Sequence, residues 1–226
     1  FHVQLSAQSY FSKFYELQNG SRHLPWGLIM EEDGIKVKVG LDSCLDTFPV
    51  CTGLIHLDKD GEVVNQQYKE FYSKFNENSF IRVEDKLYLF GNAFPFTNRP
   101  SLLILDSDFN TIQEVELDLD VDQHAFVAWE NLVFRDGYFY ASANIRTQTN
   151  TRHGLVSKFD FGFQHLKNIL IGSPTKNTFI VDLQMDEKNN LITFSSEDWN
   201  GTANVDYKFK VVTIGHTDEK KELEVA

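Results

Sequence analysis

The chain has 226 residues, of which 42% are hydrophobic and 14% aromatic, and its formal net charge is −12 at pH 7. This apolar content can form a buried core and excludes an intrinsically disordered chain. The acidic surface repels phosphate backbones and anionic headgroups, so we expect neither nucleic acid binding nor direct membrane adsorption. No apolar run in the sequence approaches the roughly 18 residues that a membrane-spanning helix needs.

The N-terminal residues 1–8, "FHVQLSAQ", begin with apolar side chains and continue with small ones. This order is typical of the end of a secretory signal peptide, whose basic and apolar parts would precede Phe1. An ordinary N-terminal strand is the alternative. We assign residues 1–8 as a candidate signal-peptide remnant and begin the folded domain at residue 9.

The two cysteines, Cys44 and Cys51, are seven positions apart and lie between two strand-like runs. A disulfide between them would close a hairpin loop and stabilise the fold by ~2 kcal/mol. Such a local pair fits an oxidising compartment, while two free thiols in a cytosolic protein are the alternative. We expect no zinc site here, because no second cysteine pair or nearby histidine pair completes four ligands.

A hairpin pattern recurs four times along the chain. The second strand of each copy begins at Ile35, Leu87, Tyr138 or Leu191, so the copies are 52, 51 and 53 residues apart. A turn rich in Asp, Gly, Asn or Lys precedes each of these strands, and such residues tolerate the positive φ of tight hairpin turns. In the first three copies a third strand follows and ends at an aspartate: Asp58, Asp106 and Asp160.

Four antiparallel strands in a repeat of roughly 50 residues are typical of a β-propeller blade. We therefore predict an all-β chain, a β-propeller of about four four-stranded antiparallel blades, as a four-bladed ring or part of a larger one. The repeats lie near 26–78, 79–130, 131–178 and 179–226, within a single domain over 9–226. A β-sandwich is the alternative. The first two strands of each repeat are the most apolar, so we expect them near the central channel and the polar last strand at the rim.

The repeats resemble those of secreted β-propellers from Bacteroidota-type bacteria. In that family a blade reads roughly as a strand, Asp-Gly, a strand ending in Gly, and then L-I-K-L-D-x-x-G. The matching segments are "EEDGIKVKVG" (31–40), "GLIHLDKDGEV" (53–63), "LYLFGNA" (87–93) and "SLLILDSDFN" (101–110). The resemblance implies a secreted, periplasmic or cell-surface protein, associated with type 9 secretion or surface adhesion as a component or cargo.

Common catalytic motifs are missing from the sequence, including Gly-x-Ser-x-Gly, His-Glu-x-x-His and a Gly-rich phosphate loop. The segment "SEDWNGT" (196–202) approaches a sialidase Asp box, but its glycine comes one place late. The seven histidines show no metal-ligand spacing, and His56 occupies the repeat position of Ile104 and Lys158, which is typical of a strand face. We therefore expect no catalytic residue, no metal site and no cofactor, and we favour a non-enzymatic role.

The loops that leave the second strand of each blade should emerge on one face of the propeller. Polar amides, charges and aromatic rings on one face suit a binding surface. The candidate binding residues on this face are Asp42, Asn92, Phe94, Asn144, Arg146, Glu197, Asp198 and Trp199. Strand capping and filling of the channel mouth are the alternative roles for these residues.

From this face we predict a non-catalytic propeller that presents its loops to a protein partner, such as an envelope or outer-membrane protein. The alternative is a glycan-active propeller enzyme, either a glycoside hydrolase or a lyase, or a glycan-binding module. In that case a glycan would take the place of the protein partner on the same face.

Overall fold

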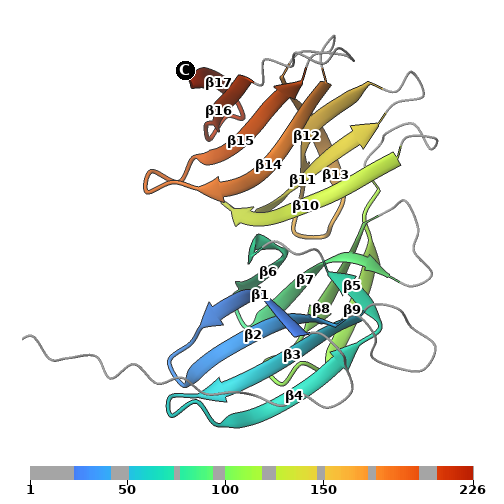
Figure 1. The fold of residues 1–226 in the computed structure, drawn as a ribbon, viewed down its shortest axis with the longest axis vertical. Helices are drawn as coiled ribbons and strands as arrows, with labels where there is room; N and C mark the ends of the chain where they lie inside the picture. The colour runs from blue at the N-terminus through green and yellow to red at the C-terminus, as the bar shows by residue number, and fades with distance from the viewer. Residues whose placement is uncertain are drawn as a thin grey trace, which may run out of the picture.

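The computed structural model describes residues 23–41, 51–73, 77–93, 100–118, 126–146, 151–172, 177–198 and 208–225. These residues form four antiparallel sheets arranged as the blades of a four-bladed β-propeller (Figure 1). The predicted all-β fold class is therefore confirmed, and the sandwich alternative is wrong. Within the described part of the chain, no helix is long and apolar enough to cross a membrane.

Each blade follows the chain from its first strand to its last. Blade 1 consists of β1 (His23–Met30), β2 (Gly34–Leu41), β3 (Cys51–Asp58) and β4 (Val63–Lys69). Blade 3 consists of β10 (Phe126–Arg135), β11 (Tyr138–Arg146), β12 (Arg152–Phe159) and β13 (His165–Ile171). Blade 4 consists of β14 (Asn177–Met185), β15 (Leu191–Asp198), β16 (Lys208–Ile214) and β17 (Lys220–Val225). This order is a simple meander, with no strand out of sequence in these three described sheets.

Blade 2 differs from the others in its first strand. Two short strands, β5 (Phe71–Ser73) and β6 (Phe80–Val83), both pair with the same neighbour, and the 3-10 helix η1 (Glu77–Ser79) lies between them. The blade continues with β7 (Lys86–Ala93), β8 (Ser101–Leu105) and β9 (Thr111–Glu116). The first strands of blades 1, 3 and 4 are interrupted by register shifts, at Pro25/Gly27, Trp129/Leu132 and Ile180/Asp182.

The hydrophobic core lies between successive blades, which pack face to face. Leu54 of blade 1 joins Phe71, Phe80 and Leu89 of blade 2 in one cluster. Two larger clusters join blade 2 to blade 3 and blade 3 to blade 4. The second and third strands are the most buried, because they lie in the middle of each sheet and pack against a neighbouring blade. The last strand β9 is largely exposed and β4 is half-buried, and neither has a fully buried residue, as expected for the rim.

The aspartates that end the third strands organise the turns that follow. The backbone N–H groups of Asn110 and Gln164 donate to Oδ1 of Asp106 and Asp160, respectively, each at 2.8 Å. The residue three places after the aspartate has a positive φ in each of these turns, namely 66° at both Phe109 and Phe163. Left-handed backbone costs a non-glycine residue about 1–2 kcal/mol. Packing offsets that cost at Phe109, which is fully buried between blades 1 and 2.

The face of blade 4 that points away from blade 3 carries a row of exposed apolar side chains. Phe194 pairs with Val211, and Val211 pairs with Leu223 on the next strand. Direct cross-strand partners point to the same side of a sheet. Phe194 and Leu223 are 46% and 67% exposed. The equivalent faces of blades 1 to 3 are covered by the following blade.

Candidate functional site

Five of the eight predicted binding residues belong to the described part of the chain, and they lie where the second strands of blades 2, 3 and 4 end. Four of them have described side chains: Asn92, Asn144, Arg146 and Glu197. For Asp198 the backbone is described, as the last residue of β15. The other three, Asp42, Phe94 and Trp199, lie outside the described residues, as does Cys44.

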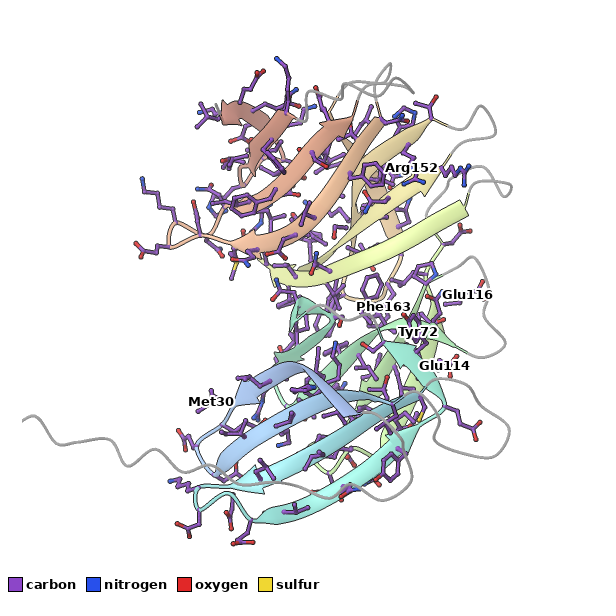
Figure 2. All side chains as sticks on the ribbon, viewed as in Figure 1. Met30, Tyr72, Glu114, Glu116, Arg152 and Phe163 are labelled. Carbon is purple, nitrogen blue, oxygen red and sulfur yellow. The ribbon has the colours of Figure 1, made fainter. Side chains whose placement is uncertain are left out.

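Two arginines face each other at this edge of blade 3. Arg146 ends β11 and pairs directly with Arg152, the first residue of β12. Both side chains are exposed, and Arg152 projects from the upper right edge of the molecule in Figure 2. Directly opposed like charges repel each other, so the sheet gains nothing from this pair by itself. An anion placed between the two guanidinium groups would remove the repulsion.

Arg152 also connects blade 3 to the first strand of blade 4. Its guanidinium carbon lies 4.7 Å from the centre of the Phe179 ring, which is cation–π distance. Its backbone N–H donates to Oδ1 of Asn177 at 2.8 Å. Asn177 in turn pairs with Asp198 across the sheet. We refer to Arg146, Arg152, Asn177 and Phe179 as the strand-end cluster.

Asn144 lies next to this cluster and contacts the backbone of blade 4. Its Nδ2 donates to the Ile180 carbonyl at 3.0 Å, and its Oδ1 accepts from the Ile180 N–H at 2.7 Å. Ile180 stands at the register shift of β14, where the strand ladder is interrupted. Backbone groups freed by such a bulge need other partners when they are buried. Asn144 therefore joins the two blades through their backbone.

Glu197 lies on the neighbouring strand β15 and is almost fully buried, with a relative exposure of 3%. It pairs with Thr178 across the sheet and accepts a hydrogen bond from Lys210 Nζ at 2.7 Å. The same hydrogen bond is the main cause that raises the pKa of Lys210 above its usual value. Glu197 is thus a buried carboxylate that is ion-paired with Lys210 beside the strand-end cluster.

The structure therefore brings four predicted residues to one place, around residues 177–180 of β14. They are Asn144, Arg146, Glu197 and Asp198. Asn92 lies in blade 2 instead, where it pairs with Tyr72 of β5. Sequence reasoning missed Arg152, Asn177 and Phe179, because it considered only the loops that leave second strands. These three residues lie at the start of β12 and β14, the strands that begin at the same edge. Arg152 could have been found from the sequence, because it faces Arg146 across a hairpin.

A buried lysine lies between blades 1 and 2. The Nζ of Lys38 donates to Oγ of Ser73 at 3.3 Å and to Oγ of Ser79, and Ser73 Oγ donates to the Phe90 carbonyl at 3.0 Å. Burial lowers the pKa of Lys38 from 10.5 to about 7. All three side chains are fully buried, so this network links the blades rather than offering a surface to a ligand.

A group of potential metal ligands lies at the opposite edge, where the tight turns are. Among the described residues, Glu31, Asp33 and His56 have ligand atoms within 4.8 Å of one another. Glu31 and Asp33 belong to the β1–β2 turn, and His56 belongs to β3. The histidine was predicted only as a strand-face residue, because its turn partners are distant in sequence.

Comparison with known structures places the fold among propellers of glycan-active enzymes. A polysaccharide lyase of family PL25, an ulvan lyase bound to -[GlcA(1-4)Rha3S]-, matches with a TM-score of 0.55 and 11% sequence identity over 93% of this chain. An exo-1,5-α-L-arabinanase from a bovine ruminal metagenomic library matches with a TM-score of 0.51 and 12% identity over 88% of this chain. The chain spans 59% of the lyase and 76% of the arabinanase.

At these identities the similarity shows the fold, a β-propeller resembling those of polysaccharide lyases and glycosidases. No protein-family model matches the sequence, and the comparison with curated proteins found no match.

Proposed function

We propose that this chain is a glycan-active propeller that binds an acidic polysaccharide at the strand-end cluster. The observation that carries the proposal is the direct pairing of Arg146 with Arg152 at an exposed edge. The chain has a net charge of −12, and two opposed arginines supply positive charge at this edge. Guanidinium groups bind carboxylates and sulfates through paired, charge-assisted hydrogen bonds.

The neighbours of the arginine pair suit a sugar chain. Asn177 supplies an amide at the same edge, and the Phe179 ring lies under the Arg152 guanidinium. Carbohydrate sites combine such polar groups with an aromatic surface. The oligosaccharide bound to the ulvan lyase, -[GlcA(1-4)Rha3S]-, contains a uronic acid and a sulfated sugar. That similarity in fold supports an acidic glycan as the ligand class for this chain.

Among enzyme reactions, the cluster supports elimination better than hydrolysis. Retaining and inverting glycosidases use a pair of carboxyl groups, one of them protonated. The carboxylate described beside the cluster, Glu197, is buried and already ion-paired with Lys210. In β-elimination a base removes the proton beside a uronate carboxylate, a C=C bond forms as the bond to the leaving sugar oxygen breaks, and that oxygen takes up a proton. Arginines that neutralise the uronate carboxylate favour loss of that proton.

Calorimetric titration with polyuronate, sulfated and neutral polysaccharides tests the proposal. We expect binding to the acidic polymers that weakens as salt is raised, because charge pairs are screened. An increase in ultraviolet absorbance from an unsaturated uronate product would identify a lyase, and binding without it a binding module. Equal affinity for neutral and acidic polymers would contradict the proposal.

A protein partner on this face remains our second candidate, as predicted from the sequence. That prediction depends on Asp42, Phe94 and Trp199, which lie outside the described residues. Secretion, a cell-surface location and association with a type 9 system likewise remain predictions that rest on the resemblance of the repeats. Loss of glycan binding in every test above would favour the protein partner.

A further inference from the structure

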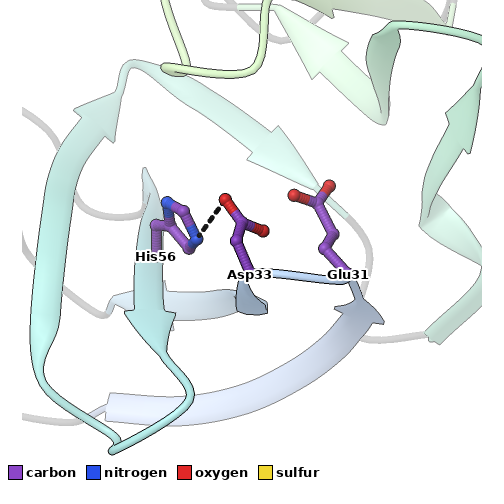
Figure 3. Close-up of side chains that lie close together, drawn as sticks. All are labelled: Glu31, Asp33 and His56. Carbon is purple, nitrogen blue, oxygen red and sulfur yellow. Dashed lines mark ion pairs between the residues drawn. The ribbon is translucent and has the colours of Figure 1, made fainter.

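The hairpin turn of blade 1 places two carboxylates beside a histidine of the third strand. Glu31 and Gly34 close the turn with reciprocal backbone hydrogen bonds of 2.9 and 3.4 Å, and Asp33 lies within it. Gly34 lies against the β3 backbone, since a Cβ there would stand 1.9 Å from the Leu57 carbonyl oxygen. This close approach brings the turn over His56, as Figure 3 shows.

The buried side chain of His56 has a nitrogen atom without a hydrogen bond. The residue is 9% exposed, and its Nε2 has no hydrogen-bond partner. The nearest carboxylate oxygen, Oδ2 of Asp33, is 3.7 Å from Nε2, which is too long for a hydrogen bond. Buried polar atoms are normally hydrogen-bonded, so a nitrogen that has no hydrogen bond and only a long contact to Asp33 leaves room for a ligand between the imidazole and the carboxylates.

We infer that Glu31, Asp33 and His56 form a binding site for a divalent transition-metal ion of the zinc class. One imidazole nitrogen and two carboxylates are a ligand set that such ions accept, and water can complete the coordination. Their ligand atoms lie within 4.8 Å of one another, so a small adjustment brings all three to one ion. The Asp33 side chain is 67% exposed and provides the entry path from solvent.

The positive charges near Glu31 affect how tightly the site can bind a metal ion. Lys36 pairs with Oε2 of Glu31 in the buried part of the turn, and Arg82 of blade 2 pairs with Oε1 at 2.7 Å. The Arg82 side chain is 42% exposed, so an ion can displace it from Oε1. Arg82 therefore competes with the metal for the same oxygen atom, and its removal should strengthen metal binding.

This site is separate from the proposed glycan site. The β1–β2 turn lies at the edge of tight turns, while Arg146 and Arg152 lie at the edge where second strands end and third strands begin. Metal binding here is thus independent of the proposed glycan function. Its physical effect would be to tie β3 to the first hairpin of blade 1.

Titration of the chelator-treated full chain with Zn²⁺ tests this site by calorimetry. We expect one ion per chain at this site and a shift of the His56 imidazole resonances in nuclear magnetic resonance spectra. Asp33→Asn should weaken the binding by about tenfold or more. Asp85→Asn, the same change in the corresponding turn of blade 2, should leave it unchanged.

Arg82→Gln provides the sharpest test, because it should tighten Zn²⁺ binding several-fold by freeing Oε1 of Glu31. Asp33 is largely exposed, so Asp33→Asn should fold normally, and its thermal unfolding without metal verifies this. Equal Zn²⁺ affinity in the natural chain and in Asp33→Asn would overturn the inference. Unchanged His56 resonances at saturating Zn²⁺ would also overturn it.

Discussion

Arg146 and Arg152 face each other as direct cross-strand partners, at the end of β11 and the start of β12. Directly opposed like charges weaken a hairpin, and an anion bound by both side chains would offset that repulsion. The Arg152 guanidinium lies over the Phe179 ring, and the Arg152 backbone N–H donates to Asn177. The pair therefore presents an ordered positive charge on an acidic chain, and this relationship is the basis of the proposed acidic-glycan site.

Substitution of Arg152 should weaken acidic-glycan binding with little loss of stability. A hydrogen bond to a charged group contributes about 1.5–3 kcal/mol, so Arg152→Gln should raise the dissociation constant roughly tenfold or more. Its exposed cation–π contact contributes only about 0.5–1 kcal/mol to folding. Isothermal titration with a polyuronate measures the effect. Arg82→Gln, the same change at the opposite edge, is the control, and an equal loss in both variants would count against the site.

Removal of the Asn144 amide should destabilise the contact between blades 3 and 4. Asn144→Ala leaves both the N–H and the carbonyl of Ile180 without this partner, which should cost about 2 kcal/mol of unfolding free energy. Urea denaturation measures it. Asn65→Ala, which removes an exposed bond from Asn65 Nδ2 to the Asp108 carbonyl at 2.7 Å, should cost less than about 0.5 kcal/mol. Similar losses in both variants would contradict a structural role for Asn144.

The Phe109→Gly variant compares the cost of backbone strain at this position with the stabilisation from packing of the Phe109 ring. Phe109→Gly removes a left-handed strain of about 1–2 kcal/mol, but it also removes a fully buried ring that contributes about 3–5 kcal/mol. We expect a net loss of about 2 kcal/mol in urea unfolding. Phe163→Gly, at the equivalent and less buried position, should lose less. A stabilised Phe109→Gly variant would show that strain outweighs packing.

Burial of Lys38 should make stability depend on pH. The folded chain releases the Lys38 proton near pH 7, while the unfolded chain holds it until about pH 10.5. The unfolded state therefore binds more protons between these values, and stability should rise with pH across the window by up to about 1.4 kcal/mol per unit. Urea unfolding of Lys38→Met over that window should show a smaller slope, and an unchanged slope would exclude Lys38 as its source.

The disulfide between Cys44 and Cys51 remains a prediction. Cys51 begins β3 and is 1% exposed. Alkylation of the denatured chain should modify both cysteines only after reduction, as read by intact mass. Replacement of both by serine should lower the unfolding free energy by roughly 2 kcal/mol. Alkylation without reductant would show that the thiols are free.

The repeating elements were predictable because their signals are local. Apolar strands, turn residues and the aspartates after third strands recur at a constant spacing, and the structure places each of them in the expected strand or turn. Phe109 and Phe163 occupy the turn position that Gly61 takes in the first repeat, which shows that a buried ring can replace a glycine.

The sites were harder to predict because they join residues from different strands and blades. Asn144 was predicted as a binding residue because of its amide group. In the structure this amide bonds to the backbone of Ile180, at a bulge in β14 that the sequence does not reveal. The contact of Arg152 with Phe179 depends on how blade 3 packs on blade 4. His56 meets Asp33 only after the hairpin folds over β3.

The most direct test of the central claim compares two forms of one polymer. A polyuronate and its carboxyl-reduced derivative share the same backbone and differ only in charge, and both can be titrated into the full chain by calorimetry. We predict measurable binding of the polyuronate and a loss of that binding after reduction, since Arg146 and Arg152 need an anion. Equal binding of the two polymers, or of neither, would contradict an acidic-glycan site at the strand-end cluster.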